Sequence, residues 1–253
     1  MRLRFPQFLA IALALITGAA LAAPRLQVGT DESLPPFSFV RDGQAVGIDV
    51  DMLRTAATRL GLNLDIVPLP WKRVLALTEN GELPLAMPLF RTAQRETFAK
   101  FTGPVHVSQS GLFVKKGREF PFASIDDLAG KRLGINRGFV FQDDLDRAIR
   151  EGKIVTEEVG TIDQNLRKLL AERIDAFAVN VVSARYVLRG SPMEAQLTVL
   201  PHLLNNHRPA FLVISRVARI PERDRLAADL QSTLEELHRD GTYQRIVERY
   251  LVP

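Results

Sequence analysis

An arginine near the start of a predicted helix is the residue best placed to bind an anion. In the segment Phe90-Arg-Thr-Ala-Gln-Arg95-Glu-Thr-Phe98, Thr92 is predicted to cap the helix, and Arg95 lies in its first turn. The dipole and unpaired N–H groups of a helix start attract anions, and a planar guanidinium matches a carboxylate through two hydrogen bonds. We therefore expect Arg95 to hold a small carboxylate, against the alternative of a solvated surface arginine.

Two further side chains are candidates for ligand contact. Trp71, the only tryptophan, precedes Lys72 and Arg73 at a predicted helix start, and it either stacks on a planar ligand or closes the core. Asp31 follows the first predicted strand, at the strand end where α/β sheets bind ligands. It either contacts a basic group or caps a turn, and the sequence leaves both alternatives open.

Composition excludes several kinds of site. The chain of 253 residues has no cysteine, which rules out disulfides and thiolate metal sites. Its four histidines, at positions 106, 202, 207 and 238, have no metal-site spacing and are interpreted as structural or exposed. His106, Ser110 and Ser183 have no context that indicates a catalytic triad. We expect no metal, no cofactor and no enzymatic activity.

The N-terminal segment is typical of a secretory signal peptide. Arg2 and Arg4 precede an apolar stretch over residues 8–16, and small residues follow at 18–23. We predict a signal peptide at residues 1–22, cleaved after Ala22, against the alternative of an uncleaved anchor. The leader has no cysteine to carry a lipid, so we expect a periplasmic protein that is not a lipoprotein. Its removal lowers the formal net charge from +4 to +2, and the mixed charges that remain do not indicate nucleic-acid binding.

Strand and helix patterns alternate along the rest of the chain. Asp42-Gly43 between two apolar runs predicts a β-hairpin, and capping boxes at Ser124 and Thr161 predict helix starts. Predicted strands cover residues 26–30, 64–69, 83–89, 111–116, 132–136, 174–179, 197–200 and 210–215; predicted helices cover 49–60, 71–80, 141–150 and 221–251, the last interrupted at 240–241. This alternation predicts two α/β domains with largely parallel sheets, joined by ordered strands because no flexible linker is present.

Several loose motifs follow one another in a specific order. They are Val28-Gly-Thr-Asp31, Gly47-Ile-Asp-Val-Asp51, Thr92-x-x-Arg95, Asp127-Leu-Ala-Gly-Lys131 and Asp240-Gly-Thr-Tyr243. With this set the chain resembles the family 3 extracellular solute-binding proteins over nearly all of its length after the leader. The resemblance implies a type II periplasmic binding fold, in which two α/β lobes with central sheets are joined by a two-strand hinge. It places lobe 1 at residues 23–107 plus 208–253, and lobe 2 at residues 108–207.

The resemblance also implies which residues bind the ligand. Arg95 falls where the family clamps the α-carboxylate of the ligand, and Leu34 falls where an aromatic residue often stacks on it. Asn180 falls where amino-acid binders carry an aspartate for the α-ammonium, and its amide oxygen is only a neutral acceptor. The other candidates are Asp31, Phe37, Trp71 and Phe90 of lobe 1, and Gly138 and Phe139 on the lobe 2 loop expected to touch the carboxylate.

The function implied by the resemblance is solute capture. We expect a monomer that closes on a small carboxylate-bearing, amino-acid-like ligand and delivers it to an ABC permease in the inner membrane. The alternatives are a ligand-sensing module for a membrane sensor and, less favoured, a dehydratase-type enzyme on the same fold.

Overall fold

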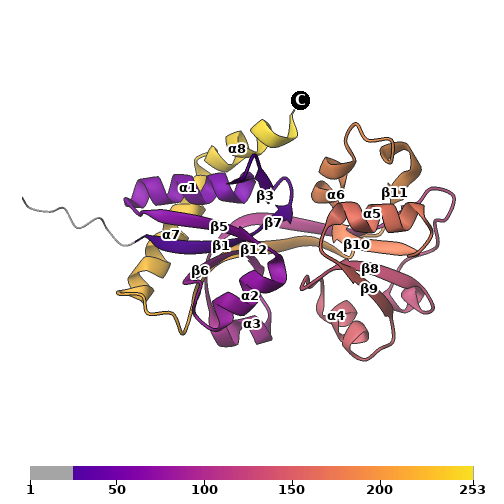
Figure 1. Cartoon of the computed structure of the whole chain (residues 1–253), viewed down its shortest axis with the longest axis horizontal. Helices are drawn as coiled ribbons and strands as arrows, with labels where there is room; N and C mark the ends of the chain where they lie inside the picture. The colour runs from indigo at the N-terminus through magenta and orange to yellow at the C-terminus, as the bar shows by residue number, and fades with distance from the viewer. Residues whose placement is uncertain (1–24, 253) are drawn as a thin grey trace, which may run out of the picture.

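Two α/β lobes lie side by side, and the chain passes between them twice (Figure 1). The computed structural model describes residues 25–252, except for the side chain of Asn206, so the predicted signal peptide lies outside the described residues. Within residues 25–252, no helix has both the length and the apolar character needed to cross a membrane.

Lobe 1 combines a parallel sheet with helices on both of its faces. Strands β1, β5 and β6 pair in parallel in the order β5-β1-β6. Helix α1 covers one face, and α2 and α3 lie on the other (Figure 1). The elements of this lobe are β1 (Leu26–Asp31), β2 (Ser33–Leu34), β3 (Ser38–Arg41), β4 (Gln44–Val46), α1 (Ile48–Leu60), β5 (Leu64–Leu69), α2 (Trp71–Glu79), β6 (Leu85–Phe90), α3 (Ala93–Phe98), α7 (Arg223–Arg239) and α8 (Thr242–Leu251).

Lobe 2 repeats this plan with a smaller sheet. Its strands β10, β8 and β9 pair in parallel. Strand β11 does not pair with them and instead pairs antiparallel with β7, one of the two long strands that connect the lobes. The elements are η1 (Ile125–Leu128), β8 (Arg132–Asn136), α4 (Asp143–Arg150), β9 (Val155–Val159), α5 (Ile162–Leu170), β10 (Ala176–Asn180), α6 (Val181–Leu188), η2 (Glu194–Gln196) and β11 (Leu197–Val199).

Two long strands connect the lobes. Strand β7 (Ala99–Lys115) has 17 residues and β12 (Asn205–Ser215) has 11, and they pair antiparallel with each other. Because β12 also pairs with β6, and β7 with β10, one sheet in the order β5-β1-β6-β12-β7-β10-β8-β9 runs through both lobes. The prediction of largely parallel sheets is therefore wrong at the centre of the molecule. The predicted lobe boundaries, after residue 107 and before residue 208, fall inside these two strands and stay a prediction.

Several predicted elements differ from the observed ones for local reasons. The sequence predicts only residues 111–116 of β7 as a strand, because Gly103, Pro104 and a run of polar residues resemble a loop. Strand β9 is not among the predicted strands. Its sequence, Val-Thr-Glu-Glu-Val, has little hydrophobic pattern because it lies at the edge of the sheet. The capping box at Ser124 opens a short 3-10 turn, whereas that at Thr161 opens α5 as predicted.

A glycine sets the geometry of the turn that leads into α1. Gly47 has φ 132°, and a Cβ there would lie 2.2 Å from the carbonyl oxygen of Phe37, so only glycine fits. Its N–H donates to the Tyr250 hydroxyl at 3.0 Å, and that hydroxyl donates to Asp51 at 3.0 Å. These bonds attach the C-terminal helix α8 to the first helix of lobe 1.

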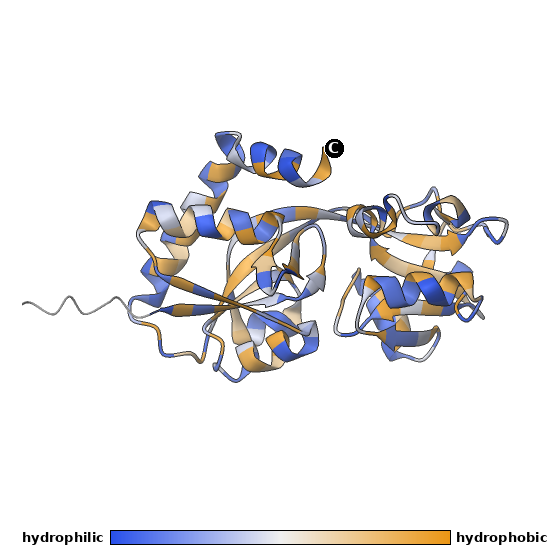
Figure 2. Ribbon diagram, turned by 45° about the horizontal axis from the view of Figure 1, so that its top comes forward, coloured by the Kyte–Doolittle hydropathy of each residue, from blue (hydrophilic) through white to orange (hydrophobic). Residues whose placement is uncertain are grey.

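Both lobes contain buried hydrophobic residues. Figure 2 shows the hydrophobic residues concentrated on the strands and the hydrophilic ones on the outer sides of the helices. In lobe 1, Met87 and Leu212 of the sheet and Leu234 of α7 are fully buried, and in lobe 2 Leu133 and Leu145 are. A buried side chain of this size contributes about 1.5–3 kcal/mol. The largest cluster of buried residues, which includes Leu234 of α7 and Leu166 of α5, extends from lobe 1 into lobe 2.

Candidate ligand-binding site

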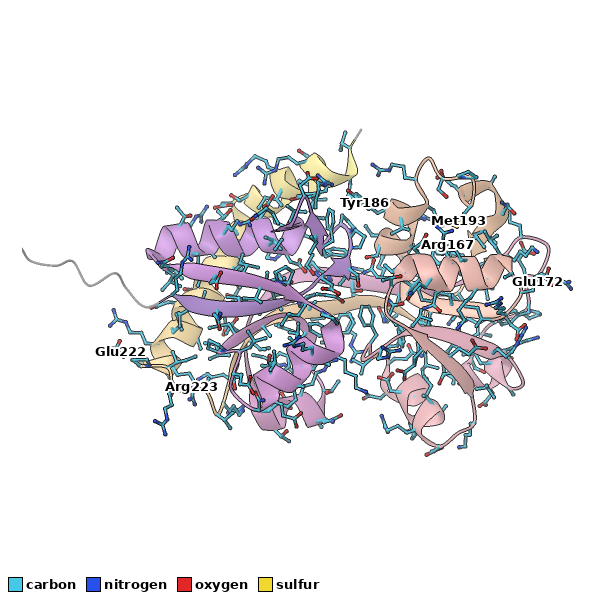
Figure 3. The ribbon with its side chains drawn as sticks, viewed as in Figure 1. Arg167, Glu172, Tyr186, Met193, Glu222 and Arg223 are labelled. Atoms are coloured by element: carbon cyan, nitrogen blue, oxygen red, sulfur yellow. The ribbon has the colours of Figure 1, made fainter. Side chains whose placement is uncertain are left out.

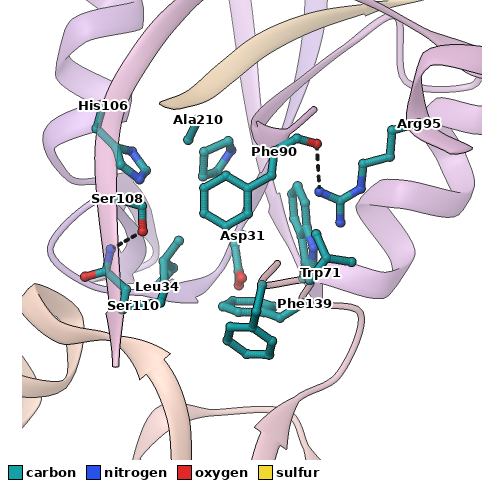
Figure 4. A pocket seen from close by; sticks show the side chains of 14 residues that line it. Asp31, Leu34, Trp71, Phe90, Arg95, His106, Ser108, Ser110, Phe139 and Ala210 are labelled. Carbon is teal, nitrogen blue, oxygen red and sulfur yellow. Dashed lines mark hydrogen bonds between the residues drawn. The ribbon is translucent and has the colours of Figure 1, made fainter. Parts of the chain in front are cut away.

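A pocket lies between the lobes, beside the two crossing strands (Figure 4). Its volume is about 40 Å³. Lobe 1, lobe 2 and the crossing strands all contribute to the wall. The lining side chains include Asp31, Leu34, Trp71, Phe90 and Arg95 from lobe 1; Phe139 and Asn180 from lobe 2; and His106, Ser108 and Ser110 from β7.

Arg95 is buried at one side of this pocket, with only 6% of its surface exposed. Thr92 caps α3 as predicted, because its Oγ1 accepts the Arg95 N–H at 3.2 Å. The guanidinium donates to the carbonyl oxygen of Phe90 at 3.2 Å and, across the lobes, to that of Gly138 at 3.3 Å. No carboxylate of a described residue forms an ion pair with it. The hydrogen-bond partners of the guanidinium are therefore neutral, and the Asp146 carboxylate acts on it from beyond ion-pair distance.

Burial also changes the electrostatics of Arg95. Desolvation, helped by the positive charge of Arg208, lowers its pKa to about 10. The Arg208 guanidinium carbon lies 4.6 Å from the centre of the Phe90 ring. Because α3 has only six residues, the attraction for an anion comes from these guanidinium charges more than from a helix dipole. A desolvated, unpaired cation is stabilised by an incoming carboxylate.

Asp31 is the carboxylate that lines the pocket. It is 2% exposed and accepts hydrogen bonds from the Ser33 N–H at 2.9 Å and the Ser33 hydroxyl at 3.2 Å. Burial raises its pKa to about 7, although the two bonds from Ser33 act in the opposite direction. Of the two alternatives left open by the sequence, Asp31 binds a neighbouring turn and also faces the cleft. A cation in the pocket would stabilise its charged form.

Asn180 lines the pocket on the lobe 2 side with its amide group already bonded. Its Oδ1 accepts the Ser183 N–H at 2.9 Å and caps α6, and its Nδ2 donates to the Ser108 hydroxyl at 2.7 Å. The predicted role as acceptor for an ammonium group therefore competes with a structural bond to α6. Figure 4 shows the bond to Ser108, which joins lobe 2 to β7.

Apolar side chains make up most of the remaining wall. Trp71 is 7% exposed, and its ring centre lies 5.9 Å from the guanidinium carbon of Arg95. Leu34, Phe90 and Phe139 also face the pocket (Figure 4). These groups exclude water, which strengthens the electrostatic interactions of Arg95 and Asp31.

Two predicted residues do not line the pocket. Phe37 is 4% exposed and lies behind His106, with the two rings stacked at 3.9 Å. Gly138 contributes its carbonyl to Arg95, and it lines a more open groove of about 440 Å³ on the other side of Arg95. Whether any of the predicted side chains binds a ligand stays a prediction.

Sequence reasoning missed the contribution of β7. His106, Ser108 and Ser110 line the pocket, because residues two apart in a strand point to the same face. The spacing of two residues between these side chains could have indicated a shared face. It could not be used, because the sequence pattern does not predict a strand at these positions of β7. Among residues 25–252, no group of three or more histidine and acidic side chains is arranged to hold a metal ion.

A pocket between two α/β lobes that are joined by two strands is the architecture of a two-lobed solute-binding protein. The chain belongs to the bacterial extracellular solute-binding proteins, family 3, whose family model matches residues 26–253. The resemblance inferred from the motifs and the predicted fold class are thereby confirmed.

Individual relatives are more distant. The chain is 26% identical to the L-cystine-binding protein TcyJ of Escherichia coli K12, over 89% of this chain and 82% of that protein. Among solved structures, it is similar to the substrate-binding protein of an amino acid ABC transporter, with a TM-score of 0.73, 21% identity, and 91% and 100% of the two chains covered. It is also similar to a histidine kinase sensor domain that resembles periplasmic binding proteins, with a TM-score of 0.77, 20% identity, and 90% and 96% covered.

Proposed function

We propose that this protein captures a small amino-acid-like carboxylate between its lobes and delivers it to an ABC importer. The observation that carries the proposal is the buried Arg95 guanidinium, which faces the inter-lobe pocket with only carbonyl partners. A ligand carboxylate supplies the missing negative charge through a bidentate, charge-assisted contact.

Asp31 is our candidate for the ammonium group of the ligand. It supplies the negative charge that residue 180 lacks in this chain, since Asn180 is neutral and its oxygen caps α6. Arg95 and Asp31 together favour a zwitterion over a simple carboxylate, because each then has an opposite charge in a desolvated pocket. The flanking Trp71 and Phe139 accommodate apolar parts of the same ligand.

Ligand entry requires the lobes to separate. A water molecule needs about 10–15 Å³ of enclosed space, so a pocket of about 40 Å³ holds only a few waters and no amino acid. The ligand therefore binds first to an open form. Its contacts with both lobes then shift the population to a closed form whose pocket is larger than the pocket in this structure.

Delivery to an importer follows the roles of the relatives. A cystine-binding protein is among them, and an amino acid ABC transporter uses a binding protein of this fold. We propose export by the N-terminal leader, action as a monomer outside the inner membrane, and binding without chemical conversion. Sensing is the second candidate, because a histidine kinase sensor domain shares the fold.

The first experiment is a thermal-shift screen of the purified protein against amino acids and organic acids, followed by calorimetry. A binding partner present at a hundredfold excess over Kd stabilises the folded protein by about 2.7 kcal/mol. An amino acid that raises the unfolding midpoint supports the proposal. If only carboxylates without an ammonium group do so, the role of Asp31 is wrong.

Arg95→Ala tests the carboxylate clamp. We expect the affinity for the best amino acid of the screen to fall at least about 100-fold, or about 2.7 kcal/mol, because a buried bidentate pair is lost. The matched control is Arg91→Ala, since Arg91 is exposed, pairs with Glu96 at 3.2 Å and stacks on Phe101 outside the pocket. An Arg95→Ala affinity within about threefold of wild type, or about 0.65 kcal/mol, would exclude Arg95 as the clamp.

A further inference from the structure

His106 presents a single unbonded polar atom beside the pocket. The ring lies on β7, lines the pocket and is 2% exposed. Its Nδ1 lies 2.9 Å from both carboxylate oxygens of Asp49, and its face stacks on Phe37 at 3.9 Å. No described residue forms a hydrogen bond with Nε2. The ring is thus held on one edge and on one face.

The state of the Asp49–His106 pair follows from its burial. Asp49 is 0% exposed, and His106 is the one described side chain that bonds to its carboxylate. A buried pair that carries net charge is costly, so the pair is most stable when neutral overall. It is then either imidazolium with carboxylate or imidazole with carboxylic acid. In both forms the hydrogen on Nε2 is present.

Neighbouring groups do not change this assignment. His238 on α7 and Tyr243 on α8 are the other titratable side chains whose charge is coupled to Asp49. Burial lowers the pKa of the His238 ring and raises that of the Tyr243 hydroxyl, so both are held in their neutral forms. Neither group therefore supplies a charge that would replace His106 as the partner of Asp49.

The position of His106 gives the pocket a second polar end. Figure 4 shows His106 and Ser108 on one side and Arg95 on the other, with Phe90 between them. The Ser108 hydroxyl accepts a hydrogen bond from Asn180 and keeps its own hydrogen available. This end of the pocket therefore offers donors, whereas Asp31 offers an acceptor.

We propose that His106 donates a hydrogen bond from Nε2 to a second acceptor oxygen of the ligand, and that Asp49 positions the ring. The inference rests on the proposed function and refines its ligand class. With the α-carboxylate on Arg95 and the α-ammonium on Asp31, the side chain of the ligand reaches His106. An amide or carboxylate side chain satisfies this donor, whereas a cationic side chain has no acceptor for it and leaves it unpaired. The site then selects ligands such as L-glutamine or L-glutamate over L-arginine or L-lysine.

Calorimetry with these four amino acids as probes tests the proposal. We expect wild type to bind L-glutamine or L-glutamate at least about tenfold more tightly than L-arginine or L-lysine. His106→Leu should weaken the preferred probe about tenfold or more, and His106→Gln, which keeps a donor, should recover part of the loss. His202→Leu is the matched control and should change little, because His202 is exposed and meets the Phe122 ring edge to face in lobe 2.

A spectroscopic measurement on the wild-type protein tests the role of His106 even if the His106 variants do not fold. In protein labelled with ¹⁵N-histidine, the His106 Nε2 should carry a proton before any probe is added, and L-glutamine or L-glutamate should shift its resonance but not that of His202. Asp49→Asn should convert His106 to a neutral ring protonated at Nδ1, since an amide oxygen then accepts its hydrogen. Loss of probe affinity with that change in the spectrum identifies Asp49 as a positioning residue.

The outcomes separate this inference from the proposed function. Preference for L-arginine or L-lysine, or an unchanged affinity in His106→Leu, overturns the role of His106 and leaves solute binding intact. The same holds if none of the four probes binds but another amino acid does. If wild type binds no amino acid in the screen, both the role of His106 and the proposed function are overturned.

Discussion

Among single residues, the burial of two charged side chains determines the character of the pocket. Arg95 and Asp31 would be solvated on an open surface, but here each is buried without a partner of opposite charge in ion-pair contact among the described residues. Their pKa values shift toward the neutral forms for this reason. Asn180, in contrast, is used to cap α6 and to bond Ser108. Charge available for binding therefore resides in lobe 1.

The raised pKa of Asp31 predicts pH-dependent binding. The ammonium group of an amino acid needs the charged carboxylate, and Asp31 gains a proton as the pH falls through about 7. We expect the affinity for the best amino acid of the screen to weaken about tenfold between pH 8 and pH 6. Calorimetry at several pH values measures this. In Asp31→Asn the affinity should be lower and independent of pH over this range, and a wild-type profile that is equally flat would contradict the role of Asp31.

The raised pKa of Asp31 predicts that stability changes with pH in the direction opposite to affinity. A carboxyl group whose folded-state pKa is raised favours folding at low pH, and this contribution is lost as the pH rises toward about 7. Because a pKa unit corresponds to about 1.4 kcal/mol, Asp31→Asn should be up to about 4 kcal/mol more stable than wild type at pH 8 and nearly equal at pH 4. Urea unfolding at the two pH values checks both parts. Higher stability with lower affinity would identify Asp31 as a residue kept for binding.

Among the elements, the loop between β8 and α4 brings lobe 2 to Arg95. Gly138 in this loop has φ 82°, which favours glycine, and its carbonyl accepts from Arg95 at 3.3 Å. A Cβ at this position would lie 3.3 Å from the Trp71 ring at the start of α2. The loop therefore needs both an unusual backbone conformation and a missing side chain to approach lobe 1.

Gly138→Ala should oppose closure of the lobes. We expect about 1–2 kcal/mol of backbone strain from the left-handed conformation, together with a tight contact against Trp71 that exists only when the lobes are closed. Gly152→Ala is the matched control, because Gly152 has φ 71° and a Cβ added there would meet nothing within 4 Å. Both variants should lose similar stability in denaturant unfolding. Only Gly138→Ala should bind the best amino acid about tenfold more weakly, and equal affinities in the two variants would contradict this account.

For the whole molecule, the closed arrangement is held by a small number of polar contacts away from the pocket. Arg41 of the β3–β4 hairpin donates to the Tyr186 hydroxyl of α6 at 3.1 Å. Arg189, which follows α6, donates to the Leu251 carbonyl of α8 at 3.0 Å. Figure 3 labels Tyr186 on lobe 2, at the side that faces the C-terminal helix. These contacts break when the lobes separate, so they add to the stability of the closed form only.

Tyr186→Phe should shift the balance between open and closed forms. An exposed hydrogen bond contributes about 0.5–1.5 kcal/mol, so we expect a two- to tenfold loss of affinity for the best amino acid and an unchanged unfolding midpoint. Tyr243→Phe, within lobe 1, is the control for loss of a hydroxyl. Small-angle scattering of the free protein should show a larger radius of gyration for Tyr186→Phe alone. No difference between the two variants in affinity or radius would remove this contact from the closing mechanism.

The predictable parts of the fold are those determined by residues that are close together in the sequence. The Thr92 cap, the hairpin at Asp42-Gly43, and the alternating strands and helices of each lobe are encoded within a few residues, so periodicity and capping predict them. Strand β7 is different, because its polar middle looks like a loop until β12 and β10 pair with it on either side. Helix α6 follows β10 directly in one apolar run, and only the cap by Asn180 marks the change.

For the site, the family, the position of the arginine and its cap are readable from the chain alone, because they depend on motifs of a few residues. The environment of those residues is set by the folded molecule. Gly138 meets Arg95, Asn180 meets Ser108, and Asp49 meets His106 across separations of 43, 72 and 57 residues. The desolvation that raises the pKa of Asp31 likewise comes from packing by distant segments. Charge strength and hydrogen-bond direction depend on what surrounds a side chain in space, and that surrounding is created by long-range packing.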